Sequence, residues 1–173
     1  MKKLLLLMML LIPVSMVAKK KVKYKKVYDY YVTSPQDAKL KYYEDSRVRF
    51  TFDWKEYKNY CISVRIKNLT DSRIYVEWEN ARIDNGQVSF DTDTYRNYQD
   101  PKPDEVIHGG GYTERNLMER KYIDSSIGIF YLDSMKYGGD SSRCYLIIPI
   151  RFGDEVVDYK ITVTLYVVQF LHT

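Results

Sequence analysis

Residue types that commonly carry chemistry are scarce in this 173-residue chain, which has two histidines, two cysteines and eight glycines. Neither histidine belongs to a spaced metal-binding pattern. No glycine-flanked serine has the form of a nucleophile elbow, and the three glycines at 109–111 lack the lysine of a phosphate-binding loop. We therefore expect a non-catalytic protein with neither a metal nor a cofactor.

Strong net charge and long hydrophobic runs are also missing. The formal net charge is +4, and loss of Lys2 and Lys3 with residues 1–18 would lower it to +2 (25 basic minus 23 acidic residues). A charge this close to balance does not indicate nucleic acid as a partner. The uncharged stretch 4–18 is interrupted by Pro13 and is shorter than the roughly 20 apolar residues that span a membrane.

The N-terminal segment has the three parts of a secretory signal. Lys2 and Lys3 precede an apolar run at 4–12, and the segment ends in Ser15, Met16, Val17 and Ala18. We expect cleavage after Ala18 and a periplasmic or secreted protein, and retention of the segment as an anchor is the alternative. No cysteine stands near Ala18, so lipid attachment at an N-terminal cysteine is not expected.

Residues 19–26, KKKVKYKK, are dense in positive charge. Such a block repels itself and stays extended, so residues 19–33 are interpreted as a basic leader followed by the first strand region. A weak contact with an anionic surface is the functional alternative. It would use Lys19, Lys20, Lys21, Lys23, Lys25 and Lys26.

Apolar residues recur at every second position in several segments, as in half-buried strands. The expected strands cover 47–54, 60–67, 74–78, 88–90, 127–132, 144–152 and 157–167. Asp84-Asn85-Gly86 marks a hairpin, a short helix is expected at 35–42 after a Ser34 cap, and 113–122 reads as a short helix or an irregular crossing. Residues 34–173 are therefore predicted to form one all-β domain, an antiparallel β-sandwich with little helix, and a closed barrel is the competing architecture.

A sequence pattern between Tyr43 and Gly86 supports this fold. An acidic turn, an Ile-x-Asn-x-Thr strand end, an Ile-x-Val-x-Trp strand and a hairpin glycine follow one another, at Asp45, Ile66, Asn68, Thr70, Ile74, Val76, Trp78 and Gly86. The pattern resembles small secreted or lipid-anchored proteins of Bacteroidota-type bacteria. The resemblance implies an immunoglobulin-type sandwich and, because most members have no assigned activity, says little about mechanism.

The 18 tyrosines outnumber the 6 phenylalanines and 2 tryptophans. Tyrosine suits cross-strand pairs and also makes good contact surface. We place the candidate binding surface on the polar segment 91–112, with Tyr95, Tyr98 and Tyr112, because loops on a rigid scaffold usually carry binding sites. The expected function is an accessory or binding module for an envelope component, a glycan or a protein.

Two other functions stay open at this point. A secreted hydrolase would use carboxylates such as Asp91 and Asp93, and a structural subunit would assemble by pairing of edge strands.

Two further local features make separate predictions. Cys61 and Cys144 are a candidate disulfide, but Cys144 is in phase with inward residues of its strand and Cys61 is out of phase, so a bonded and a free pair remain open. Asn68-Leu69-Thr70 forms a glycosylation sequon, which we interpret as a turn in which Asn68 binds its own backbone.

Overall fold

The computed structural model describes residues 24–36, 39–56, 60–93, 97–120, 129 and 141–172. These residues form eleven strands and one short 3-10 helix, with no α-helix among them. The elements are β1 (Tyr24–Ser34), β2 (Tyr42–Glu44), β3 (Val48–Asp53), β4 (Ile62–Asn68), β5 (Ile74–Val76), η3 (Trp78–Asn80), β6 (Arg82–Ile83), β7 (Gly86–Phe90), β8 (Glu105–Ile107), β9 (Tyr112–Glu119), β10 (Ser141–Phe152) and β11 (Glu155–His172). The expected signal segment 1–18 lies outside the described residues, as does the expected strand at 127–132 apart from Ile129.

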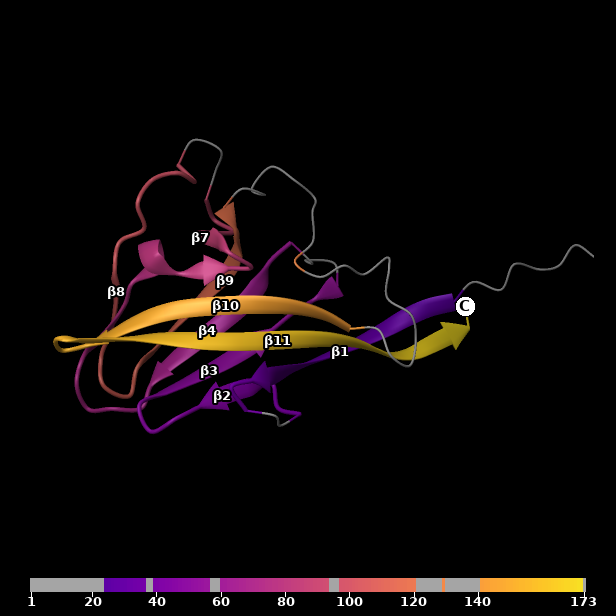
Figure 1. Cartoon of the computed structure of the whole chain (residues 1–173), viewed down its shortest axis with the longest axis horizontal. Helices are drawn as coiled ribbons and strands as arrows, with labels where there is room; N and C mark the ends of the chain where they lie inside the picture. The colour runs from indigo at the N-terminus through magenta and orange to yellow at the C-terminus, as the bar shows by residue number, and fades with distance from the viewer. Residues whose placement is uncertain are drawn as a thin grey trace, which may run out of the picture.

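The strands form one antiparallel sheet that curls almost into a barrel (Figure 1). The order is β1-β11-β10-β6-β7-β9-β4-β3-β2, and β5 joins β10 to β8. The two ends of this order meet where the Val32 N–H donates to the Leu40 carbonyl oxygen at 2.7 Å. The predicted all-β antiparallel fold is confirmed, whereas the finer prediction of an immunoglobulin-like sandwich is not, because the sheet nearly closes on itself.

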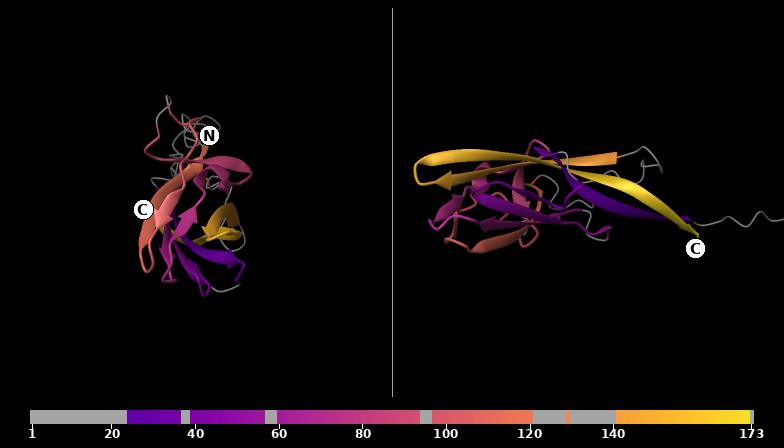
Figure 2. Two further views of the ribbon diagram at one scale, coloured as in Figure 1. Left: turned by 90° about the vertical axis from the view of Figure 1, so that its left-hand side faces the viewer. Right: turned by 90° about the horizontal axis from the view of Figure 1, so that it is seen from below.

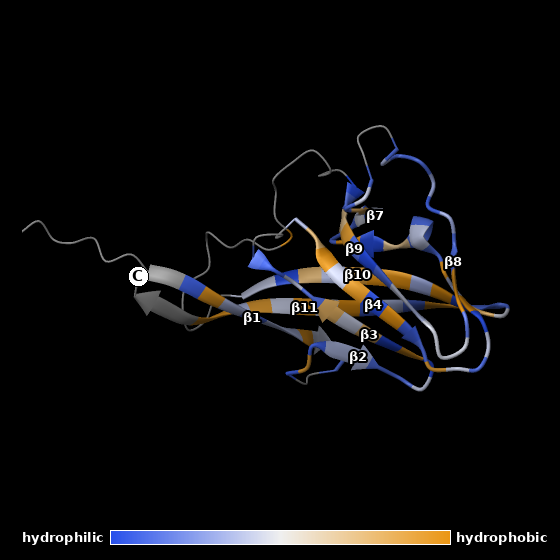
Figure 3. Ribbon diagram, turned by 180° about the vertical axis from the view of Figure 1, so that it is seen from behind, coloured by the Kyte–Doolittle hydropathy of each residue, from blue (hydrophilic) through white to orange (hydrophobic). Residues whose placement is uncertain are grey.

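The core is built from alternating residues, as Figure 3 shows along β3 and β4. In β3, Val48, Phe50 and Phe52 are buried and the residues between them are exposed. In β4, every second residue from Ile62 to Asn68 is buried. Because side chains of a strand alternate between its two faces, one face of each strand fills the interior and the other meets solvent.

The two longest strands, β10 and β11, form a hairpin across the whole molecule. Their register runs from Phe152↔Glu155 to Ser141↔Tyr166, with Gly153 in the left-handed region (φ 61°) at the turn. The predicted strands at 144–152 and 157–167 are confirmed and extended. Beyond Tyr166, β11 continues beside β1, and the two run past the ends of the other labelled strands (Figures 1 and 2).

The hairpin predicted at Asp84-Asn85-Gly86 is also confirmed. Ile83 pairs with Gly86, and the two residues between them have positive φ, 52° at Asp84 and 93° at Asn85. This is the backbone of a two-residue type I′ turn, which aspartate and asparagine tolerate. Gly86 itself opens β7, where the side chain of Glu119 lies too close for a Cβ atom.

Two secondary-structure predictions are wrong. In the segment predicted as a helix at 35–42, Leu40 bridges Val32 and Tyr42 begins β2. The segment 113–122 contains β9, an eight-residue strand. Its glutamate, arginine and methionine residues favour helix only weakly, and pairing with β4 on one side and β7 on the other overrides that preference.

Among the residues that the structure describes, no helix combines the length and apolar character required to cross a membrane.

Candidate functional site

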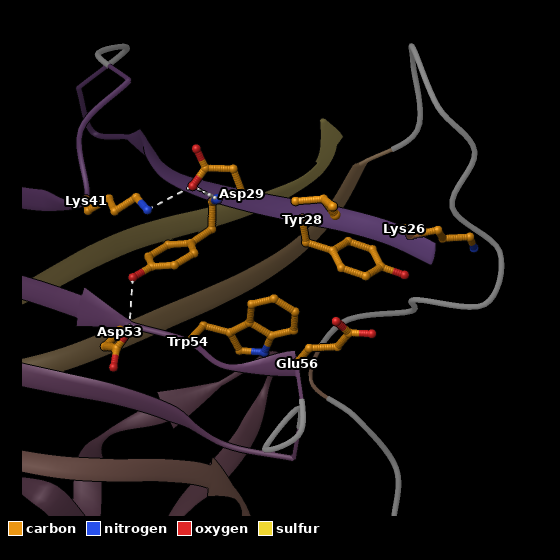
Figure 4. A pocket seen from close by; sticks show the side chains of 9 residues that line it. Lys26, Tyr28, Asp29, Lys41, Asp53, Trp54 and Glu56 are labelled. Atoms are coloured by element: carbon orange, nitrogen blue, oxygen red, sulfur yellow. Dashed lines mark hydrogen bonds and ion pairs between the residues drawn. The ribbon is translucent and has the colours of Figure 1, made fainter. Parts of the chain in front are cut away.

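A groove of about 410 Å³ opens between β1 and the end of β3 (Figure 4). It is lined by Lys26, Val27, Tyr28, Asp29, Tyr30, Lys41, Asp53, Trp54 and Glu56. The groove lies near the seam where the sheet almost closes, since β1 and β2 are joined only through the Val32–Leu40 bridge among the described residues. The seam therefore leaves side chains of β1 and β3 facing each other across an opening.

The aromatic wall of the groove follows from the strand alternation. Asp53 is the last outward residue of β3, and Trp54 follows it on the inward face with 8% of its surface exposed. Tyr28 on β1 meets the indole of Trp54 edge-on, with ring centroids 6.0 Å apart. Figure 4 shows Tyr28 opposite Trp54, with Glu56 beside the indole and Lys26 farther along β1.

At one end of the groove the Asp29 carboxylate is fully engaged. It pairs with the Lys41 ammonium at 2.9 Å and accepts hydrogen bonds from the Tyr31 hydroxyl (2.5 Å) and the Tyr30 N–H (2.9 Å). Burial would raise the pKa of Asp29, but these hydrogen bonds and the Lys41 charge outweigh it and hold the pKa below its usual value.

The same carboxylate protects the edge of β1. Val32 directs its N–H away from β11 to Leu40, so the Tyr30 N–H, two residues away, points to the same side. Asp29 accepts that N–H and thereby removes a backbone donor that an added strand would need.

Tyr30 closes the bottom of the groove. Its hydroxyl donates to the Phe52 carbonyl oxygen at 3.1 Å and to Asp53 Oδ1 at 3.3 Å, and Lys41 Nζ stands 4.5 Å from its ring centroid. Burial, followed by the nearby Asp53 charge, raises the pKa of Tyr30 to about 12. Tyr30 is therefore a neutral donor that fixes the position of Asp53.

Two carboxylates of the groove remain open to a ligand. The Asp53 side chain is 57% exposed, with the Lys55 ammonium 3.7 Å away. Glu56 is exposed and has no hydrogen-bond or ion-pair partner among the described residues. With Lys55 beside Asp53, three ammonium groups stand against the three carboxylates of the groove, so its charges balance.

Of the three tyrosines predicted as a binding surface, the structure describes Tyr98 and Tyr112. Tyr95 lies outside the described residues. Tyr98 is half-buried, and its hydroxyl accepts a hydrogen bond from Gln99 Nε2 at 2.7 Å. Tyr112 is 64% exposed on β9, where the Arg65 guanidinium stands 5.0 Å from its ring centroid. The described contacts place Tyr98 and Tyr112 in separate surroundings.

The loop between β7 and β8, residues 91–104 and here named the pinned loop, is held by buried polar contacts. Asp93 pairs with the Lys102 ammonium at 2.8 Å, and the two side chains are 10% and 6% exposed. Asp93 also accepts hydrogen bonds from Ser89 Oγ (2.7 Å) and the Phe90 N–H (2.8 Å). Burial would raise the pKa of Asp93, but these contacts, that with Lys102 first, hold it below its usual value.

The remaining contacts of the pinned loop also use up polar groups. Asp91 accepts a hydrogen bond from Asn116 Nδ2 at 2.8 Å, so Asp91 and Asp93, the carboxylates considered for a hydrolase, are both engaged. The Lys102 N–H donates to Glu79 at 2.8 Å, and the Trp78 indole N–H donates to Glu105 at 2.8 Å. The first two contacts anchor Asp91 and Lys102 of the loop to β9 and η3.

The cysteines and the sequon have structural settings. Cys61 and Cys144 are both buried free thiols, so the candidate disulfide is not formed in this structure. Asn68 is fully buried, and its side-chain oxygen accepts the Thr70 N–H at 2.9 Å while its amide donates to the Ser72 and Ile107 carbonyls. The predicted turn in which Asn68 binds its own backbone is confirmed.

The lysine block and the histidines add little to the site. Lys26 lines the groove, while Lys19, Lys20, Lys21 and Lys23 lie outside the described residues and the side chain of Lys25 is not described. His108 is exposed at the turn before β9. Within the described ranges, no three histidine, cysteine, aspartate or glutamate side chains gather as a metal site would require.

Comparison of the chain with protein-family models, curated proteins and solved structures finds no match in any of the three.

Proposed function

We propose that this protein is an exported, non-catalytic binding module and that the groove between β1 and β3 binds a neutral glycan. The observation that carries the proposal is the pairing, in one open groove, of an aromatic wall with two carboxylates, Asp53 and Glu56, that are exposed to solvent. Ligand sites typically combine apolar and aromatic lining with a few convergent polar groups. Export rests on the N-terminal segment 1–18, which has the form of a secretory signal.

The charges in the groove favour an uncharged ligand. Lys41 is already paired with Asp29, so an anionic ligand would have to compete with that pair. It would also meet the open carboxylates of Asp53 and Glu56, and like charges at short range disfavour binding. A sugar instead offers hydroxyl groups, which donate to carboxylates, and C–H surface, which packs on the half-buried ring of Tyr28 beside Trp54.

The test is retention of the chain, produced without residues 1–18, by neutral polysaccharides (glucan, mannan and xylan) in native affinity gels. We expect retention by at least one of them and none by an anionic polysaccharide such as polygalacturonate. The double variant Asp53→Asn, Glu56→Gln should reduce affinity roughly tenfold, equivalent to about 1.4 kcal/mol. The matched control Asp154→Asn removes a carboxylate at the exposed β10–β11 turn and should bind like the unmodified chain.

Three results would contradict the proposal. If none of the neutral polysaccharides retains the chain, a neutral glycan is excluded as the ligand. If the double variant and the control bind with equal affinity, the ligand does not bind in the groove. Release of reducing ends from a bound polysaccharide, abolished in the double variant, would replace a binding module with a hydrolase that uses these two carboxylates.

A further inference from the structure

A second hollow, here named the outer hollow, lies on the solvent-facing side of the sheet. It measures about 210 Å³ and is lined by Thr51, Phe52, Asp53, Ser63, Arg65 and Glu114. The strand register brings these residues together: Asp53 pairs with Ser63 and Thr51 with Arg65 between β3 and β4, and Arg65 pairs with Glu114 between β4 and β9. The outer hollow therefore crosses three neighbouring strands.

Asp53 belongs to both hollows. It lines the groove beside β1 and the outer hollow above β4. Because Asp53 is the last residue of β3 and its side chain is 57% exposed, the two hollows meet around the end of that strand. Asp53 is the residue that the linings of the two hollows share.

The outer hollow offers planar hydrogen-bonding groups. Arg65 donates to Glu114 through Nε at 2.8 Å and Nη2 at 2.6 Å, and Ser63 Oγ donates to Glu114 Oε1 at 3.3 Å. The Arg65 and Glu114 side chains are 53% and 45% exposed, so each keeps hydrogen-bonding capacity toward solvent. Their opposite charges are already paired, which suits a neutral ligand with both donors and acceptors, as in adjacent sugar hydroxyls.

We infer that the two hollows form one track for a single extended, uncharged oligosaccharide that bends around Asp53. This inference rests on the proposed function of the groove and adds a second subsite on the outer face. A ligand that fills only the groove misses the contacts of the outer hollow, so affinity rises with the length of the oligosaccharide. The Tyr112 ring, whose centroid stands 5.0 Å from the Arg65 guanidinium, contacts the hollow only through Arg65.

The test compares disaccharides and hexasaccharides of glucose, mannose and xylose by isothermal titration calorimetry. We expect the hexasaccharide of the preferred sugar to bind at least about tenfold more tightly than its disaccharide. Ser63→Trp, which fills the outer hollow from an outward position where aromatic residues suit a strand, should abolish this advantage and leave disaccharide affinity unchanged. The control Lys67→Trp lies on the same strand and face, outside the hollow, and should keep the advantage.

Each outcome separates the two proposals. Equal affinity of the disaccharide and hexasaccharide, or an unchanged length advantage in Ser63→Trp, overturns the track and leaves the groove as a binding site. Binding of no oligosaccharide overturns the proposed function and the track with it. If Ser63→Trp does not fold, as judged by circular dichroism, Glu114→Gln replaces it, and it should weaken hexasaccharide binding several-fold without changing disaccharide binding.

Discussion

The pinned loop and the groove contain the same residue types but differ in how far their polar side chains are exposed to solvent. A tryptophan, a lysine–aspartate pair and further carboxylates lie in or beside each region. Beside the pinned loop, Trp78 of η3 is 1% exposed and its indole N–H is bound to Glu105 of β8, and within the loop the Asp93–Lys102 pair is buried. In the groove, Asp53 and Glu56 face solvent beside the aromatic wall. Polar side chains that pair with each other stabilise the fold, whereas those left exposed can bind a ligand.

Removing the carboxylate of Asp93 should have the largest effect on stability. Asp93→Ala leaves the Lys102 ammonium buried without its partner, and breaking such a pair from one side typically costs about 3–5 kcal/mol. We expect a loss of about 3 kcal/mol in the free energy of unfolding, measured by urea denaturation. The control Asp100→Asn, an exposed residue of the same loop, should change it by less than about 0.5 kcal/mol.

Glycan affinity of Asp93→Ala, measured below its unfolding transition, should match that of the unmodified chain. A large loss of affinity in Asp93→Ala, with its fold intact, would mean that the pinned loop belongs to the binding site, which would contradict its purely structural role.

The same carboxylate makes stability depend on acidity. The pKa of Asp93 is lowered in the folded chain from 3.8, so its contribution is complete above pH 3.8 and is lost as the pH falls through the folded-state pKa. The free energy of unfolding should therefore fall on acidification. Asp93→Asn should show a shallower fall in urea denaturation series at pH 7 and pH 3, and an equal fall would show that other carboxylates carry the dependence.

In the groove, removal of the Tyr28 ring should lower affinity for the glycan. Tyr28→Ala removes the ring that faces Trp54, and we expect glycan affinity to fall roughly tenfold, equivalent to about 1.4 kcal/mol. The control Tyr166→Ala removes another half-buried tyrosine, which lies on β11 and contacts Tyr31 of β1. It should lower the thermal midpoint of unfolding to a similar extent and keep the affinity. Equal affinities for the two variants would contradict the role of the aromatic wall.

The described tyrosines of the predicted binding surface, Tyr98 and Tyr112, should have the smallest effects. Tyr98→Ala should change neither glycan affinity nor, beyond about 0.5 kcal/mol, the free energy of unfolding. Tyr112→Ala should weaken hexasaccharide binding by less than about threefold because it acts through Arg65. Titration of both variants with the hexasaccharide checks this order. A larger loss of affinity in Tyr98→Ala than in Tyr112→Ala would show that the ligand binds at the pinned loop.

Strand periodicity accounts for what could be predicted of the fold. Alternation identified β3, β4, β10 and β11, and Asp84-Asn85 identified the hairpin. β9 was missed because Glu114, Arg115 and Asn116 interrupt its alternation, and its strand conformation depends on pairing with β4 and β7. Among the described residues, the two ends of the sheet are bridged between Val32 of β1 and Leu40, which lies just before β2, and no local sequence pattern reveals a contact between these two segments.

The groove was not predicted because its parts come from separate segments. Trp54 read as the last residue of an alternating strand, and Tyr28 as part of the region following the lysine block. Only the seam between β1 and β3 brings them together. One signal was present in the sequence: the strand at 47–54 ends in Asp53-Trp54, followed closely by Glu56, which places an aromatic ring and two carboxylates at one strand end. The pinned loop attracted attention because its composition is polar, yet two of its charged residues, Asp93 and Lys102, pair with each other in the interior.

The two tryptophans of the chain allow a direct comparison of the two regions. Two-dimensional ¹H–¹⁵N spectra contain one indole N–H signal for each, and Trp54→Phe assigns them. On titration with the preferred hexasaccharide, the account predicts that the Trp54 signal shifts progressively while the Trp78 signal stays in place. A shift of Trp78 with Trp54 unchanged would contradict it and place the ligand on the pinned loop.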